Sequence, residues 1–99
     1  MAENKVLTLA RQYADAVRGT MEAKNIFLYG SQAQGTATQH SDIDIAVVVD
    51  EIPGDYLNVM ALLWKLGREI SHDIEPVLLS DDDMDSGFLQ TVQHTGIAV

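Results

Sequence analysis

The stretch IFLYGSQAQGTATQHSDIDIAVVVD, residues 26–50, contains two apolar segments separated by small and polar residues. Residues 26–29 form a short apolar run with β-branched and aromatic side chains, which predicts a buried strand that ends at Gly30. Residues 42–50 begin with polar and apolar residues in alternation and then become wholly apolar. This change is typical of a central strand whose first residues reach an open site. The small, polar residues 31–38 are expected to form a loop or a short helix between the two strands.

Amphipathic helices are predicted on both sides of this stretch. Apolar residues recur at three- and four-residue spacing over residues 3–22, with Gly19 near the end. A second helix is predicted over residues 55–71, after the Pro-Gly-Asp turn. A last helix is predicted over residues 81–94, because residues 80–83 resemble a capping box with acidic side chains at the positive end of a helix.

The remaining apolar segments predict further strands. Residues 73–79 read as a third strand, and Pro76 within it indicates an edge or a bulge. Gly96 is expected to end the last helix, so that residues 97–99 dock as a strand. The order predicts an α/β (α+β) fold in which a small mixed β-sheet is flanked by helices. We expect one domain over residues 1–99, since a chain of this length builds a single core.

Composition excludes several classes of function. The net charge is −9, and the six basic residues are too few and too scattered to form a nucleic-acid groove, so no direct nucleic-acid partner is expected. No apolar run approaches the roughly 20 residues of a membrane span, and no signal peptide is recognisable, so we expect a cytoplasmic protein. Without cysteine, any metal must be held by oxygen or imidazole ligands, which favours a hard cation.

Acidic side chains are paired on two of the predicted strands. Asp42 and Asp44 are two residues apart, so they project from the same face with Cβ atoms roughly 6.5–7 Å apart. Such a pair is either a solvated rim or half of a divalent-cation site. Asp73 and Glu75 form a second pair, and Glu75 is the better third ligand because Asp73 lies at the strand start. Three carboxylates from two strands would suit a two-magnesium site.

The turn at Gly30-Ser31 precedes the first of these acids. Gly30 lets the backbone approach a phosphate, and the Ser31 hydroxyl can donate to the same anion. The alternative is a simple turn with Ser31 as a helix N-cap.

These features combine into a known pattern. Gly30-Ser31, ten intervening residues and Asp42-x-Asp44 resemble the GS-x10-DxD signature of the DNA polymerase beta-like nucleotidyltransferase superfamily. In length the chain is similar to the minimal nucleotidyltransferases (MNT). The resemblance covers most of the chain, from the strand at Phe27 into the C-terminal helix.

The resemblance implies a role for each matching residue. Gly30 and Ser31 would hold the triphosphate of an NTP such as ATP. Asp42 and Asp44 would bind two Mg²⁺ ions, and Glu75 would complete the metal site and help to activate the acceptor hydroxyl. The implied reaction transfers a nucleoside monophosphate and releases pyrophosphate, by in-line displacement at the α-phosphorus.

Relatives often have an arginine in the loop after Gly-Ser, and this chain differs from them there. The positions here hold Gln32 and Gln34, which can hydrogen-bond a phosphate oxygen but bring no charge. Weak NTP affinity is therefore expected unless Lys65, Arg68 or a partner supplies a cation. Having glutamate at position 75, where many relatives have aspartate, is a smaller departure.

Other residues have plainer explanations. His40 is read as an exposed loop residue, and His72 and His94 as residues near helix ends. Tyr29 is read as a strand residue flanking the site. Trp64 lies on a helix that is apolar on most sides, which predicts either burial under the C-terminal segment or a second chain, in a homo- or hetero-oligomer.

Three functions follow from the resemblance. MNT proteins commonly act with HEPN (higher eukaryotes and prokaryotes nucleotide-binding) RNases as antitoxin and toxin, transferring AMP from ATP to a tyrosine of the toxin. The first hypothesis is therefore a protein adenylyltransferase and antitoxin. The second is a catalytically weak antitoxin that acts by binding alone. The third is a small-molecule nucleotidyltransferase of the aminoglycoside type, which would need an acceptor pocket formed by a dimer.

Overall fold

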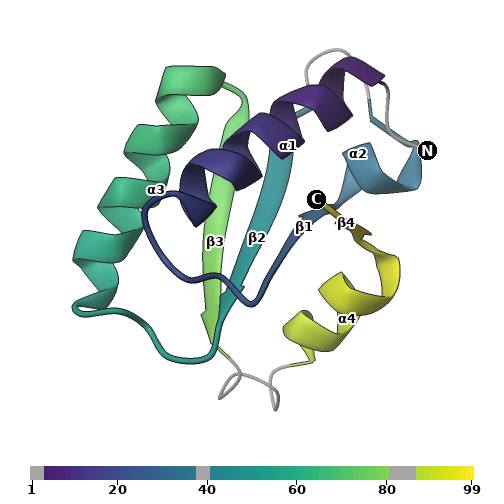
Figure 1. Ribbon diagram of the computed structural model, residues 1–99. Coiled ribbons are helices and arrows are strands. Elements are labelled where there is room, and N and C mark those ends of the chain that lie inside the picture. Colours follow the sequence, from purple (N-terminus) through teal and green to yellow (C-terminus); the bar gives the residue numbers. More distant parts are fainter. Residues whose placement is uncertain (1–3, 38–40, 81–86) are drawn as a thin grey trace.

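The computed structural model describes residues 4–37, 41–80 and 87–99. Its helices and strands follow one another along the chain as α1 (Asn4–Arg18), β1 (Asn25–Tyr29), α2 (Ser31–Gln34), β2 (Ile43–Val49), α3 (Tyr56–Ile70), β3 (Ile74–Ser80), α4 (Phe88–Thr95) and β4 (Ile97–Ala98). Figure 1 shows α1 and α3 side by side on one face of the sheet and α4 on the other.

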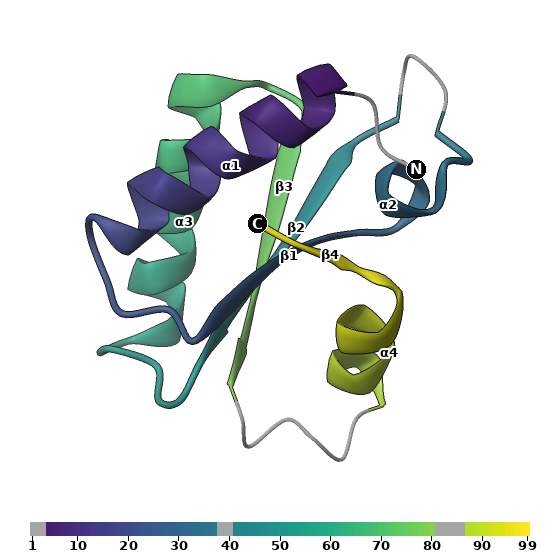
Figure 2. The same ribbon diagram turned by 45° about the vertical axis from the view of Figure 1, so that its right-hand side comes forward.

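The four strands form one mixed sheet in the order β3-β2-β1-β4. β1 pairs with β2 and β4 in antiparallel fashion, whereas β2 and β3 run parallel and are joined through α3. Figure 2, a turned view, shows three layers: α1 and α3 form the first, the sheet the second and α4 the third. This architecture confirms the predicted α/β fold with a small mixed sheet.

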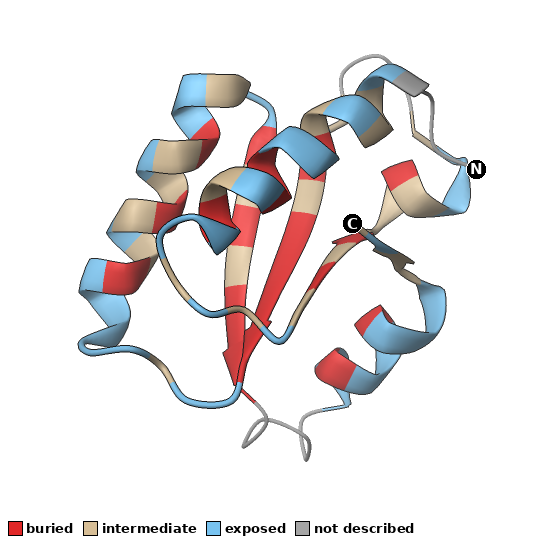
Figure 3. Ribbon diagram, viewed as in Figure 1, coloured by how far each residue is buried: buried red, intermediate tan, exposed pale blue. Residues whose placement is uncertain are grey.

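The core divides between the two faces of the sheet because successive strand residues point to opposite sides. On β2, residues 43, 45, 47 and 49 belong to the cluster that packs with α1 and α3. Ala46 and Val48 belong to a smaller cluster, with Leu89 and Val92 of α4. β2 is buried along most of its length, as Figure 3 shows, which agrees with its wholly apolar sequence.

Two close contacts hold α1, α3 and β3 together. The buried hydroxyl of Tyr13 in α1 donates to the carbonyl oxygen of Leu63 in α3 at 2.9 Å. Burial raises the pKa of Tyr13 above its ordinary value, which keeps the hydroxyl protonated as a donor. At Gly67 a Cβ atom would lie 3.2 Å from Ile74 Cγ2, so the absent side chain lets α3 approach β3 closely.

Most element boundaries agree with the sequence prediction. α1 is shorter than expected and ends at Arg18, because the following N–H groups of Thr20 and Met21 both turn back to the carbonyl oxygen of Val17. β3 is an edge strand, which confirms the position inferred from Pro76. Residues 97–98 pair with β1 as expected.

The start of the last helix differs from the prediction. α4 begins at Phe88, directly after Gly87, whose φ of 76° lies in the left-handed region. Ser80 is the last residue of β3. Residues 81–86, which hold the rest of the predicted capping box, lie outside the described residues.

α3 buries one side and leaves other apolar residues partly open. Val59, Leu63 and Gly67 are buried, whereas Leu57 is 73% and Tyr56 47% exposed. Trp64 is partly buried. Among the helices of residues 4–37, 41–80 and 87–99, none has the length and apolar character needed to cross a membrane.

Candidate active site at the start of β2 and β3

Three polar side chains, those of Tyr29, Asp44 and Glu75, lie next to one another across the sheet near the start of β2. The register pairs Tyr29 of β1 with Asp44 of β2, and Asp44 with Glu75 of β3. Paired residues point to the same face, so these side chains lie on the α4 side of the sheet. Asp42 stands two residues before Asp44 and is exposed, while the other three residues are partly buried. We call Asp42, Asp44 and Glu75 the carboxylate row.

The three acids act on one another electrostatically. Burial, followed by the charge of Asp42, raises the pKa of Asp44 above its ordinary value. Burial also raises the pKa of Glu75, together with the charge of Asp42, a side-chain hydrogen bond to Asp42 and the charge of Asp44. The strands therefore hold like charges together, and a cation at this place would relieve their repulsion.

Gly30 links the turn before α2 to the carboxylate row. Its φ of 73° and ψ of −153° fall in a region that is essentially restricted to glycine. A Cβ atom at this position would lie 2.6 Å from Oδ2 of Asp44. The backbone before Ser31 thus lies against the carboxylate, and Ser31 opens α2 beside it.

The two glutamines of α2 have different surroundings. Gln34 is exposed, and nothing in its placement opposes the expected contact with a phosphate. Gln32 is only 7% exposed, and its Nε2 donates to the carbonyl oxygen of Ser41 at 3.3 Å. Gln32 therefore ties α2 to the residue before Asp42, a role that its residue type alone does not indicate.

Arg68 is the basic residue whose charge acts on the carboxylate row. Its Nη1 donates to the carbonyl oxygen of His72, just before β3, and its guanidinium lies 4.9 Å from the ring centroid of Trp64. Its charge opposes the rise in the pKa of Glu75. Of the two cations expected from sequence, Lys65 and Arg68, Arg68 is the one whose charge acts on Glu75.

The histidines do not join the carboxylate row in the part of the chain that the structure describes. His94 lies in the last turn of α4, as expected for a residue near a helix end. The exposed His72 follows α3 by two residues and contributes its backbone carbonyl to Arg68. His40 lies outside the described residues.

The donor set suits a hard cation, although its side chains are not arranged around one. Three carboxylates with no sulfur ligand are the kind of ligand that Mg²⁺ takes. Within residues 4–37, 41–80 and 87–99, however, no three acidic or histidine side chains are gathered closely enough to hold one metal ion.

Two aromatic rings lie beside the carboxylate row. Burial, with the charges of Asp44 and Glu75, raises the pKa of Tyr29 to about 12, so its hydroxyl is neutral at physiological pH. The ring of Phe88 meets Tyr29 edge to face, with centroids 5.6 Å apart and planes at 83°. Tyr29 flanks the site as expected from sequence. Phe88 lies within the helix predicted over residues 81–94, and nothing in the sequence indicates its contact with Tyr29.

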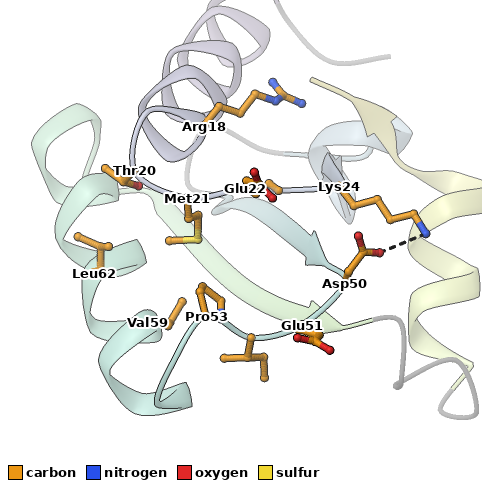
Figure 4. A pocket seen from close by; sticks show the side chains of 12 residues that line it. Arg18, Thr20, Met21, Glu22, Lys24, Asp50, Glu51, Pro53, Val59 and Leu62 are labelled. Atoms are coloured by element: carbon orange, nitrogen blue, oxygen red, sulfur yellow. Dashed lines mark ion pairs between the residues drawn. The ribbon is translucent and has the colours of Figure 1, made fainter.

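A hollow of about 990 Å³ lies elsewhere, between the α1–β1 connection, the β2–α3 connection and α3. Figure 4 shows the ion pair between Lys24 and Asp50 at its side, with Nζ and Oδ1 3.7 Å apart. Asp50 follows Asp44 by six residues along β2, which places the hollow about 20 Å from the carboxylate row. The candidate site is therefore identified by its chemistry and not by this hollow.

Two solved structures are similar to this chain. A putative nucleotidyltransferase from Sulfolobus solfataricus has the same fold, with a TM-score of 0.72 and 21% identity, over 95% of this chain and 78% of that one. The toxin–antitoxin complex MntA-HpeT, solved as a mutant, contains a chain that is 30% identical, with a TM-score of 0.60 over 100% of this chain and 72% of that one.

The family assignment follows from a match to the sequence itself. No curated protein matches the chain. Residues 12–99 match the family model described as Polymerase beta, Nucleotidyltransferase, and this range includes the Gly30 turn and the whole carboxylate row. The chain belongs to the polymerase beta nucleotidyltransferase family.

Proposed function

We propose that this protein transfers AMP from ATP to a tyrosine hydroxyl of a HEPN RNase toxin and so acts as its antitoxin in the cytoplasm. The observation that supports the chemistry is the carboxylate row beside Gly30. It places the turn at Gly30 next to three acids. Asp44 and Glu75 are paired in the sheet register, and Asp44 lies against the backbone of the turn. An enzyme that transfers a nucleoside monophosphate from a nucleoside triphosphate to a hydroxyl can use a phosphate-binding turn beside acidic metal ligands.

Each residue of the site has a place in the proposed reaction. Ser31 and the backbone at Gly30 bind the triphosphate, and Asp42, Asp44 and Glu75 hold two Mg²⁺ ions. When bound, Mg²⁺ neutralises phosphate charge and lowers the pKa of the acceptor hydroxyl. Glu75 would accept the proton of that hydroxyl as a general base.

The transfer balances as a substitution at phosphorus. The acceptor oxygen forms a bond to the α-phosphorus, the bond from that phosphorus to the bridging oxygen breaks, and pyrophosphate leaves. Asp42 and Glu75 would have to turn their carboxylates away from each other in order to hold a cation. We expect Gln32 to limit this motion to the side chains, because it fixes the backbone at Ser41.

The proposed partner comes from the similarity to MntA in the MntA-HpeT toxin–antitoxin complex. Two features of this chain suit a protein acceptor. The net charge of −9 favours a basic partner such as an RNase. The exposed Leu57 and Tyr56 at the start of α3 provide apolar side chains for contact with another chain.

Mass spectrometry tests the proposal directly. The purified protein is incubated with ATP, Mg²⁺ and the product of the neighbouring gene, and the partner is expected to gain the mass of one AMP on a tyrosine. Omitting Mg²⁺ should prevent the change. If no mass shift appears and the wild type behaves like the double variant Asp42→Ala/Asp44→Ala, the proposal is wrong.

A second candidate is an antitoxin that acts by binding alone. The observation that favours it is the weak positive charge at the site, where Gln32 is buried and Gln34 is neutral. Under this alternative, Asp42→Ala/Asp44→Ala would still neutralise the partner. The third candidate, transfer to a small molecule, would instead give labelled aminoglycoside with no partner protein present.

Arg68 is expected to strengthen nucleotide binding. We predict that Arg68→Gln weakens the binding of Mg-ATP about tenfold, because a charge-assisted hydrogen bond contributes about 1.5–3 kcal/mol. Arg68→Lys should retain part of the affinity. Lys65→Gln, an exposed cation on the same helix, is the matched control and should change affinity little. Isothermal titration calorimetry checks this, and equal effects of the two glutamine variants would contradict it.

A further inference from the structure

Phe88 is a large aromatic residue left 40% exposed beside the carboxylate row. Its ring contacts Tyr29, which pairs in the sheet with Asp44. The other large apolar residues exposed in the described part of the chain, Tyr56 and Leu57, lie on α3. Part of Phe88 is thus exposed, and Tyr29 lies between Phe88 and Asp44 of the proposed metal site.

α4 holds this ring in a defined position. Leu89, the next residue, and Val92 are almost fully buried against β-strand residues of the smaller core cluster. The N–H of Thr91 donates to the carbonyl oxygen of Gly87 at 3.0 Å and closes the first turn around Phe88. The edge-to-face contact with Tyr29 fixes the ring from a second direction. An anchored, partly open aromatic ring is a preorganised stacking surface.

We propose that the open face of Phe88, supported by Tyr29, is the subsite that stacks the nucleobase of the donor nucleotide. This inference rests on the proposed nucleotidyl transfer. A nucleotide whose phosphates lie at Gly30 and the carboxylate row would place its base near Tyr29, and the ring of Phe88 contacts Tyr29 there. Every base has a π-face, and stacking on an aromatic side chain contributes about 1–3 kcal/mol.

The chemistry of the ring also sets the expected selectivity. Phenylalanine carries no hydrogen-bond donor or acceptor, so it cannot read the edges of a base. The subsite therefore discriminates by stacking area, and we expect purine triphosphates to bind better than pyrimidine triphosphates, with little difference between ATP and GTP.

A comparison of two ligands tests the proposal. Inorganic tripolyphosphate carries the phosphates of ATP but no base. Phe88→Leu is expected to weaken Mg-ATP binding about 5- to 100-fold in calorimetry, while the affinity for Mg-tripolyphosphate stays within about twofold. Phe88→Tyr, which keeps a ring, should bind ATP like the wild type. Leu57→Ala is the control for loss of an exposed apolar side chain on α3.

The possible results separate this inference from the proposed function. Equal weakening of both ligands by Phe88→Leu would overturn the subsite, since Phe88 would then act through the fold. Unchanged ATP binding in Phe88→Leu, or wild-type protein that binds tripolyphosphate as tightly as ATP, would also overturn it while leaving nucleotidyl transfer intact. Wild-type protein that binds neither ligand would remove the proposed function and this inference together.

Discussion

Asp44→Asn is expected to abolish nucleotidyl transfer and, in the absence of Mg²⁺, to make the fold more stable at neutral pH. The asparagine keeps the shape of the side chain but removes the charge that would hold a cation, so activity should fall by about a hundredfold or more. The same change removes a partly buried carboxylate that is repelled by Asp42. The substitution is therefore expected to lower activity and to raise the stability of the metal-free fold.

The pH dependence of stability has the same origin. The pKa values of Asp44 and Glu75 are raised in the folded protein, so the folded state binds these protons more tightly than the unfolded state. Their contribution is most favourable below the ordinary carboxyl pKa of about 4 and declines as the pH rises through the raised values. As the pH rises from the ordinary carboxyl pKa through the raised pKa values, the metal-free wild type should lose stability relative to Asp44→Asn. Mg²⁺ should restore it.

Thermal unfolding in the presence of EDTA, recorded from pH 4 to 8, measures this effect. The difference in melting temperature between Asp44→Asn and the wild type should grow with pH and shrink when Mg²⁺ replaces EDTA. Asp73→Asn is the matched control, since Asp73 is exposed and lies just before β3. A wild type that is as stable as Asp44→Asn at pH 8 in EDTA would contradict the electrostatic account.

Gly30→Ala is expected to lower both stability and activity. The backbone at Gly30 has a conformation that costs other residues about 1–3 kcal/mol. The added Cβ would also lie 2.6 Å from Oδ2 of Asp44, so the carboxylate must move. For a chain of this size, a loss of 1 kcal/mol corresponds to a fall in melting temperature of about 4–8 °C. Displacing Asp44 should reduce transfer at least tenfold.

Gly54→Ala separates these two effects. Gly54 also has a positive φ, 102°, but a Cβ there would meet nothing within 4 Å. Its variant should be destabilised by backbone strain and keep full activity per folded molecule. Melting curves and transfer rates of both variants, measured at a temperature where each is folded, check the prediction. Full activity in Gly30→Ala would show that the close approach to Asp44 has no catalytic consequence.

Much of the active site could be predicted from the sequence because its geometry is local. The spacing of Asp42 and Asp44 places both on one face of a strand whatever surrounds them. Pro76 indicated an edge strand or a bulge, and β3 is an edge strand. Glu75 was preferred over Asp73 because Asp73 lies at the strand start. That a third acid reaches the first two needed the assumption that β2 and β3 are neighbours, which the register confirms.

Other properties depended on contacts between distant segments. Gln32 was expected to face a phosphate, whereas its side chain is buried and bonds Ser41. Phe88 could be assigned to an apolar helix face, but not to the side of Tyr29. Neither contact leaves a periodic signal in the chain, because each depends on how two elements pack.

The sequence by itself determined the fold class, the turn at Gly30 and the pairing of Asp42 with Asp44, because residue type and short spacing control backbone conformation and strand face. Only the tertiary structure decided which cation reaches the acids and which aromatic ring lies beside them. Arg68 and Phe88 come from helices on opposite faces of the sheet. Their approach to Glu75 and Tyr29 is set by helix packing, which acts between residues far apart in the chain.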